Sequence, residues 1–183
     1  ADLIVLGAGP GGYAAAFYAA EMGRDVTLIE EGDRLGGVCL NRGCIPSKAL
    51  IHATEVMNEA CESEHRGITF EKPKVNLDKM REWKESIIEK LSAGVSGLAK
   101  KRKVTVIKGR GYFEDSKTLR VETEEGQKFI NFNHAIIAVG SVPALPGAFD
   151  LGNKRIMTST EALEIEEIPK SLLVVGGGYI GME

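Results

Sequence analysis

The fold is decided by residues 2–12, DLIVLGAGPGG, an apolar run that leads directly into a cluster of glycines. A short run of aliphatic residues that stops at glycine predicts a buried strand. The glycines satisfy the pattern G-x-G-x-x-G at Gly7, Gly9 and Gly12. Such glycines permit a tight turn and allow a pyrophosphate to approach the N-terminus of the next helix. The stretch therefore predicts a dinucleotide site, provided that a helix and a second strand follow.

The sequence after this turn supplies both elements. Residues 13–22 are rich in alanine, a strong helix former, and Gly23 can end the helix. A second apolar run, 26–29, is followed by Glu30, 18 residues after the last glycine of the pattern. A carboxylate at this place can accept hydrogen bonds from a ribose. The alternative is an ordinary glycine turn in a β-α-β unit.

The same pattern recurs near the end of the chain. The apolar run 172–175 predicts a strand and leads into Gly176, Gly178 and Gly181, which stand in the same register. Two such patterns predict two nucleotides and two domains, at residues 1–150 and 151–183. The chain starts in a strand without a methionine and stops at Glu183, early in an expected helix. We therefore expect a fragment of a longer protein, cut before the acid or arginine that separates NAD from NADP.

The middle of the chain predicts an α/β fold. Two long segments, 44–61 and 77–100, have helical patterns. Short strands separated by turn residues suggest a small antiparallel β-meander attached to a Rossmann-like parallel sheet. A buried strand then precedes Gly140, and a short helix near Ser159, its expected cap, enters the second domain. The expected strands of this region are 104–107, 112–113, 118–122, 128–131 and 135–140.

The apolar stripe of the helix at 77–100 predicts which residues face the core. Its members recur at steps of three and four residues. Trp83 falls close to this stripe, so we expect its ring to lie in the core. The members of the stripe are Met80, Ile87, Leu91, Val95 and Leu98.

The run CLNRGCIPSK, residues 39–48, predicts the chemistry. It places Cys39 five residues before Cys44 and Lys48 four residues after it, and Gly36-Gly37 before the run allow the backbone to approach a ligand closely. In a helix, Cys44 and Lys48 lie on one face, one turn apart. A cation there favours the thiolate, which is the reactive form of cysteine. The run therefore predicts a dithiol/disulfide redox centre.

Two alternatives for the cysteines are a structural disulfide and a zinc site. A disulfide that closes so short a loop contributes only about 2 kcal/mol. A chain of 183 residues, 43% of them hydrophobic, buries enough surface to fold without it. A structural zinc site needs four ligands in paired short spacings. The remaining candidates, Cys61, His52, His65 and His134, do not supply that pattern.

Composition excludes several classes of partner. The net charge is -3, and the only basic run, 100–103, follows a helical pattern and is better explained as a helix C-terminus. Nothing therefore indicates a nucleic acid or an anionic membrane as a partner. No apolar stretch approaches the length of a membrane span. Three cysteines, two of them in a redox pattern, fit a reducing cytoplasm.

The chain resembles the flavoprotein disulfide reductases, the class I pyridine nucleotide-disulfide oxidoreductases. The resemblance rests on residues 36–48, on both glycine patterns and on the stretch 138–143, AVGSVP. Within this family, the motif CLNxGCIPSK is similar to that of the dihydrolipoamide dehydrogenase branch. The chain departs from the usual pattern at Val139, where threonine is common. Mercuric or glutathione reductases, or a non-catalytic FAD-binding fragment, are the alternatives. The resemblance covers the whole chain.

The resemblance implies a function for each part. Residues 1–150 would bind FAD and carry the redox-active disulfide, and 151–183 would begin an NAD-binding domain; NADP is not excluded. The protein would reoxidise the lipoyl group of a 2-oxo acid dehydrogenase or glycine cleavage complex as a homodimer. The catalytic histidine of this family comes from a C-terminal region across the dimer, and no histidine here matches its motif. We therefore expect this chain alone to be inactive.

The resemblance also implies roles for single residues. Cys39 would exchange with the lipoyl sulfur, Cys44 would pass electrons to the flavin, and Lys48 would lie near flavin N5 with Glu183 as its partner. Tyr179 would cover the nicotinamide pocket. The residues expected to contact the two cofactors are Gly7, Gly9, Gly12, Glu30, Gly37, Lys48, Gly111 and Gly140, and, for the second nucleotide, Gly176, Gly178, Tyr179 and Gly181.

Overall fold

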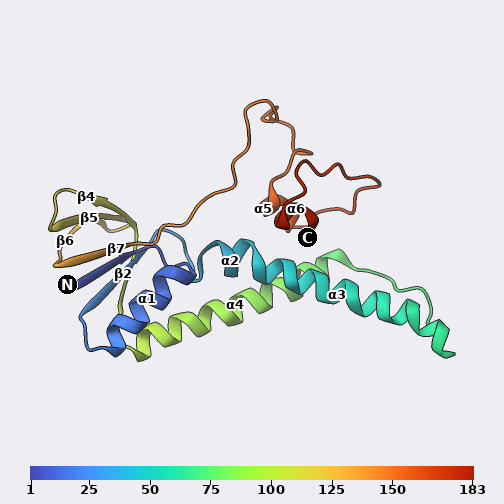
Figure 1. Ribbon diagram of the computed structural model, residues 1–183, viewed down its shortest axis with the longest axis horizontal. Helices are drawn as coiled ribbons and strands as arrows, with labels where there is room; N and C mark the ends of the chain where they lie inside the picture. Colours follow the sequence, from blue (N-terminus) through green and yellow to red (C-terminus); the bar gives the residue numbers. More distant parts are fainter. The chain divides into compact units, whose positions relative to one another are not determined.

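The computed structural model describes residues 1–183, which divide into two compact units. The sheet unit comprises Ala1–Asn41 and Glu89–Ser141, and the helical unit comprises Arg42–Ile88 and Val142–Glu183. Figure 1 labels their elements along the chain. The predicted boundary at residue 150 lies close to the point where the chain enters the helical unit for the last time, and the assignment of domains stays a prediction.

A parallel sheet organises the sheet unit (Figure 1). Its strands are β1 (Leu3–Leu6), β2 (Val26–Glu30), β3 (Thr105–Lys108) and β7 (His134–Ile137), in the order β3-β2-β1-β7. All neighbours run parallel, with Leu3 opposite both Val26 and His134. Helix α1 (Pro10–Glu21) connects β1 to β2, and Pro10 stands in its first turn, where a missing N–H breaks no helical bond. The predicted parallel sheet is confirmed.

The central strands β1 and β2 are buried on both faces, which explains the continuous apolar sequence of β1. The outer strand β7 is exposed along its length, so the prediction of a buried strand before Gly140 is wrong. Leu3 and Val5 point to one side and pack with Phe17 of α1. Ile4 and Leu6 point to the other side, where they meet a second sheet. The residues contributed by that second sheet are Leu119 and Val121, both completely buried.

The second sheet is an antiparallel meander of β4 (Arg110–Phe113), β5 (Thr118–Thr123) and β6 (Gly126–Asn131), in the order β4-β5-β6. The meander predicted from the turn residues is therefore confirmed. Only the central strand is well buried on one face, as alternation of apolar and polar residues in Thr118–Thr123 requires.

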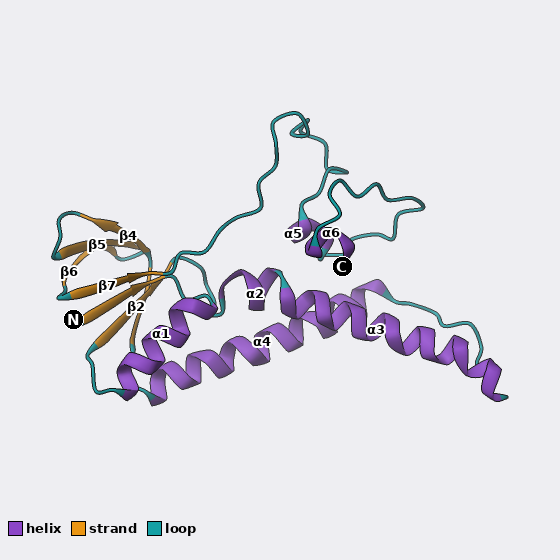
Figure 2. Cartoon of the chain, in the orientation of Figure 1, coloured by secondary structure: helices purple, strands orange, loops and turns teal.

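The helices also follow the predicted pattern (Figure 2). After α1 come α2 (Gly37–Arg42), α3 (Cys44–Glu62), a 3-10 turn at Ser63–Arg66 and α4 (Leu77–Lys101). Two four-residue helices follow, α5 (Ser159–Ala162) and α6 (Tyr179–Met182). None of the helices has both the length and the apolar character that a bilayer span requires.

The buried side of α4 differs from the predicted stripe. Trp83 is 40% exposed, so the prediction of a core tryptophan is wrong. The buried positions include two polar side chains, Lys84 and Ser92. Each has a hydrogen-bond partner, since Lys84 donates to the carbonyl of Leu163 and Ser92 to that of Leu35. The hydrophobic periodicity could not register these positions, because their burial depends on hydrogen bonds to distant backbone.

Two local predictions in the helical unit need correction. The run 172–175 is not a strand, and its Leu173 side chain is 86% exposed. The helical unit contains no strand with which it could pair. The cap of α5 is Thr158 instead of Ser159, and it forms a reciprocal capping box with Glu161.

Candidate functional site

The first glycine pattern forms a turn that excludes side chains. Gly7 has φ of +91°, and a Cβ atom there would lie 2.3 Å from the carbonyl oxygen of Ala138. A Cβ on Gly12 would lie 1.7 Å from the carbonyl oxygen of Gly7. Gly9 is the N-cap of α1, and no side chain caps this helix. The first N–H groups of α1 therefore have no side-chain partner and suit an anion.

A second glycine loop packs against this turn. Gly37 has φ of +62°, and a Cβ on it would lie 2.5 Å from Cα of Gly9. Gly11, on the turn itself, has no heavy atom within 4 Å of an added Cβ. The two loops touch through backbone alone and leave one side of the turn open. This cradle has the form that a pyrophosphate requires.

Glu30, at the end of β2, is held by the same turn. It accepts hydrogen bonds from the N–H of Ala8 at 2.7 Å and from the N–H of Gly32 at 2.8 Å. Each carboxylate oxygen can accept a further bond. The carboxylate is thus oriented and still able to accept a hydroxyl, and its predicted ribose contact stays a prediction.

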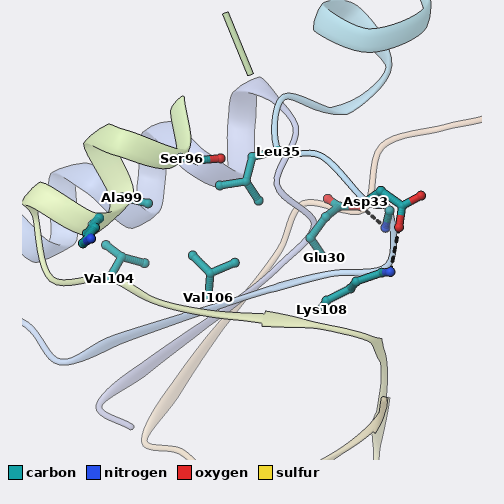
Figure 3. A pocket seen from close by; sticks show the side chains of 10 residues that line it. Glu30, Asp33, Leu35, Ser96, Ala99, Val104, Val106 and Lys108 are labelled. Carbon is teal, nitrogen blue, oxygen red and sulfur yellow. Dashed lines mark hydrogen bonds and ion pairs between the residues drawn. The ribbon is translucent and has the colours of Figure 1, made fainter. Parts of the chain in front are cut away.

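A cavity of about 380 Å³ opens beside Glu30 (Figure 3). Its polar rim includes Glu30, Asp33 and Lys108. Lys108, the last residue of β3, lies 2.6 Å from a carboxylate oxygen of Asp33 and 2.7 Å from one of Glu124. The apolar wall is formed by Leu35, Ala99, Val104 and Val106. A wall of this kind with a polar rim suits a flat, partly apolar ring with a hydroxylated substituent.

The ion pair between Asp33 and Lys108 shifts the pKa of both residues. The hydrogen bond from Lys108 is the main cause that lowers the pKa of Asp33 below its ordinary value. The bond to Asp33, followed by the bond to Glu124, raises the pKa of Lys108. Sequence reasoning did not single out either residue. Only their position along the chain could have identified them, because the carboxyl ends of the adjacent parallel strands β2 and β3 meet at one edge of the sheet.

We expect Asp33→Asn to remove part of the acid sensitivity of folding. Because the folded pKa of Asp33 is depressed, its charged form stabilises the fold above the ordinary value of 3.8. That contribution is lost as the pH falls through the depressed pKa. Urea unfolding at about pH 6 and about pH 3 should therefore show a smaller difference between the two proteins at the lower pH. In a Lys108→Met background, Asp33→Asn should have no effect at either pH, and an equal effect there would contradict the assignment.

The predicted redox cysteines lie at a helix junction. Cys39 is in α2 and is partly buried, whereas Cys44 is the first residue of α3 and is exposed. The structure has no disulfide bond between any of the three cysteines. Because α3 is helical from Cys44 onward, Lys48 follows it by one turn, as expected. The role of the pair as a disulfide stays a prediction.

Lys48 and Glu183 form an ion pair, which is the contact that the resemblance implies, and their catalytic roles stay predictions. The two residues are 135 positions apart, and both belong to the helical unit. The Lys48 side chain is 62% exposed and that of Glu183 is 34% exposed. The contact therefore joins the C-cap of α6 to the helix that begins at Cys44.

The second glycine pattern repeats the geometry of the first. Gly176 has φ of +111°, and a Cβ on Gly181 would lie 2.1 Å from the carbonyl oxygen of Gly176. Gly178 is the N-cap of α6 with φ −78° and ψ −178°, close to the −70° and −178° of Gly9. Tyr179 follows it and is 98% exposed. The turn thus forms although the preceding strand does not.

The remaining site candidates have simpler surroundings. Gly111 lies in β4, where a Cβ would be 3.3 Å from side-chain carbons of Leu6 and Leu119. This glycine packs closely against the core, and its predicted cofactor contact is untested. Gly140 has φ of +68° and open space around it. His52 is exposed and lies 3.7 Å from Glu55, in accord with a solvated histidine.

Comparison with known proteins identifies the family. The sequence model of the family described as "Pyridine nucleotide-disulphide oxidoreductase" matches residues 1–183. The chain belongs to this family. The class of protein that the cysteine run and the two glycine patterns predicted is therefore confirmed.

Several curated relatives share one name. This chain is 49% identical over 183 residues to a dihydrolipoyl dehydrogenase of Vibrio cholerae and 52% identical over 182 residues to one of Staphylococcus aureus. Each alignment covers 100% of this chain and 38% of the relative. A dihydrolipoyl dehydrogenase of Bacillus subtilis is 50% identical over 182 residues. The chain thus spans a little over a third of the length of the relatives it matches.

A solved structure supports the same assignment. The HOCl-induced flavoprotein disulfide reductase RclA of Escherichia coli matches this family member with a TM-score of 0.81 and 26% sequence identity. The match covers 99% of this chain and 38% of RclA. The α/β fold described above is therefore that of a flavoprotein disulfide reductase.

Proposed function

We propose that this chain is the FAD-binding part of an enzyme that reoxidises dihydrolipoamide and transfers the electrons through FAD to NAD. The observation that carries the proposal is the backbone cradle formed by the Gly7–Gly12 turn, the uncapped N-terminus of α1 and Gly37. The names of the relatives, each about half identical to this chain, support the substrate. Because each relative is much longer than this chain, we propose that a longer protein supplies the rest of the NAD-binding domain and the dimer interface.

FAD fits the residues of the sheet unit. The N–H groups at Gly9 and the start of α1 would hold the pyrophosphate, because no side chain caps them. Glu30 would accept from the ribose, and the cavity bounded by Leu35 and Val106 would take the adenine ring. When bound, FAD accepts an electron pair and passes a hydride to the nicotinamide.

The cysteines would supply the thiol chemistry. In the oxidised protein, a lipoyl thiolate attacks Cys39 of the Cys39–Cys44 disulfide, forms a mixed disulfide and releases Cys44 as a thiolate. The second lipoyl thiolate then attacks the lipoyl sulfur in the mixed disulfide, which forms lipoamide and releases Cys39. The substrate is oxidised by two electrons and the cysteine pair is reduced by two. Lys48, one turn after Cys44, provides a positive charge close to the released thiolate.

The second turn would receive the pyridine nucleotide. Its glycines match the first turn in φ and in close approach, so the same backbone contact to a pyrophosphate is available. Tyr179, at the start of α6, would cover the nicotinamide. We further propose a cytoplasmic homodimer of the longer protein, which provides a histidine base. Its partner would be the lipoyl group of a 2-oxo acid dehydrogenase or glycine cleavage complex.

The first test is cofactor binding. The purified chain should be yellow, or should become yellow on reconstitution, and should release one FAD per chain on denaturation. FMN lacks the adenosine half and should bind far more weakly, because it cannot use Glu30 or the cavity. A protein that takes up no FAD, or that takes up FMN equally well, would contradict the proposal.

A second candidate is a flavoprotein disulfide reductase of another branch. The similarity to RclA favours it, because that protein is described as a flavoprotein disulfide reductase and its description names no lipoyl substrate. Both candidates require FAD and the cysteine pair, so FAD binding does not separate them. Turnover by the longer protein with dihydrolipoamide, compared with glutathione disulfide and mercuric ion, decides between them.

A further inference from the structure

Lys84 of α4 is a buried cation held by a distant segment. Its side chain is only 3% exposed. The ammonium group donates to the carbonyl oxygen of Leu163 at 2.8 Å and lies 3.2 Å from a carboxylate oxygen of Glu164. A lysine is almost never buried unless it is paired, so these contacts account for its position.

Arg81, one turn earlier on the same face of α4, extends this attachment. Its guanidinium donates to the carbonyl oxygens of Ile165 at 2.9 Å and Glu166 at 3.4 Å. It also pairs with Asp78. Residues three apart on a helix are neighbours, so Arg81 and Lys84 together hold four consecutive residues, 163–166. We call this contact the latch.

The backbone at the latch is unusual. Ile165 has φ of +43°, in the left-handed region that a β-branched residue rarely adopts. Such a conformation persists only where the surrounding contacts impose it. Upstream, Thr158 and Glu161 cap α5 reciprocally, so the segment is fixed on both sides of the helix.

A second contact joins the same C-terminal segment to the helices. Glu183 forms its ion pair with Lys48 of α3. Between the latch and α6, residues 167–178 run as exposed chain without regular structure. Their only hydrogen bonds in the structure lead to the N–H groups of α6. The latch is therefore the nearest preceding attachment of the segment that brings Glu183 to Lys48.

We propose that Arg81 and Lys84 are positioning residues that hold the chain so that Glu183 meets Lys48. The stretch between the latch and Glu183 is roughly 18 residues long. Without the latch, the stretch that tethers Glu183 is counted from Val142, where the chain re-enters the helical unit, and is roughly 41 residues long. Effective concentration falls with about the −3/2 power of tether length, so opening the latch lowers it about threefold. Under the proposed function this sets the environment of the dithiol, but the contact itself can be measured without FAD.

A zero-length carbodiimide tests the proposal, because it joins an amine to a carboxylate only where the two are in contact. The product between Lys48 and Glu183 is quantified by mass spectrometry. In Lys84→Met its yield should fall about threefold. Lys84→Arg keeps a donor and a charge and should restore most of it. The product between Lys128 and Glu125, which lie 3.1 Å apart in the sheet unit, is the internal reference.

The control is Lys90→Met, an exposed lysine of α4 that makes none of these contacts. Its yield should equal that of the unaltered protein. If Lys84→Met also lowers the reference product, Glu164→Gln decides, because Glu164 is 58% exposed and its substitution leaves the buried side chain in place. A lower yield of the Lys48–Glu183 product in Glu164→Gln supports the latch. An unchanged yield in Glu164→Gln, or in a folded Lys84→Met, overturns it.

Discussion

Gly12→Ala is expected to weaken FAD binding by about a hundredfold, the cost of losing one or two hydrogen bonds to a charged group. The added Cβ would lie 1.7 Å from the carbonyl oxygen of Gly7, so the turn must open. Opening moves the first N–H groups of α1 away from the place where the pyrophosphate would lie. Titration of the FAD-free protein with FAD, followed by flavin fluorescence, measures the change.

Gly11→Ala is the matched control for this substitution. It makes the same chemical change one position earlier, where an added Cβ has no heavy atom within 4 Å. We expect FAD binding to change by less than about threefold. Equal losses in the two variants would show that the turn tolerates no alanine for reasons other than geometry, and equal retention would show that FAD does not use this turn.

Replacement of either cysteine by serine is expected to change the flavin spectrum, and the two variants should differ in opposite ways. Cys39→Ser leaves Cys44 as the thiolate beside the flavin, and the FAD-loaded protein should show a long-wavelength absorbance band. Cys44→Ser removes that thiolate and should show no such band. In the longer protein, each substitution should lower turnover with dihydrolipoamide by at least about a thousandfold, because neither serine can form the disulfide.

Cys61→Ser is the control for both variants. Cys61 is exposed near the end of α3, and the proposed mechanism does not use it. Its spectrum and turnover should match those of the unaltered protein. The band in Cys44→Ser instead of Cys39→Ser would reverse the two roles, and its absence from both would exclude a thiolate contact with the flavin.

The parallel sheet and the first turn could be predicted because their determinants are local. The sequences of β1 and β2 are largely apolar because these two central strands are covered on both faces. The glycines of the turn are required by φ and by backbone contact, and both leave a clear trace in the sequence. The same is true of the helix that begins at Cys44, which places Lys48 one turn away.

The buried face of α4 could not be predicted in this way. Trp83 falls close to the predicted apolar stripe, yet the neighbouring Lys84 is buried instead. The carbonyl of Leu163 compensates the buried ammonium, and that partner is 79 positions away. Hydrophobic periodicity reflects only the hydrophobicity of the side chains within the helix, so it contains no information about a distant hydrogen-bond acceptor.

The strand predicted at 172–175 failed for a related reason. Its aliphatic sequence favours a strand, but a parallel strand needs neighbours for its backbone hydrogen bonds. The helical unit has no strand to offer. In contrast, Gly176 and Gly181 form the second turn without a sheet, because their contact lies within six residues.

The candidate site was likewise only partly visible in the sequence. Glu30 could be recognised because it stands at a fixed distance after the glycines. Lys108 and Asp33 could not, because their pairing requires knowledge that β3 lies next to β2. The sequence separates these two strands by 74 residues, and the sheet order brings their carboxyl ends together.

The central claim is that the cysteine pair and the flavin exchange electrons. Its most direct test is an anaerobic titration of the oxidised, FAD-loaded protein with a dithiol, followed by absorbance. We predict that the first two electrons per flavin reduce the cysteine pair and produce the long-wavelength band while the flavin stays oxidised, so that four electrons are needed for full reduction. Complete bleaching of the flavin by two electrons, without the band, would contradict the account.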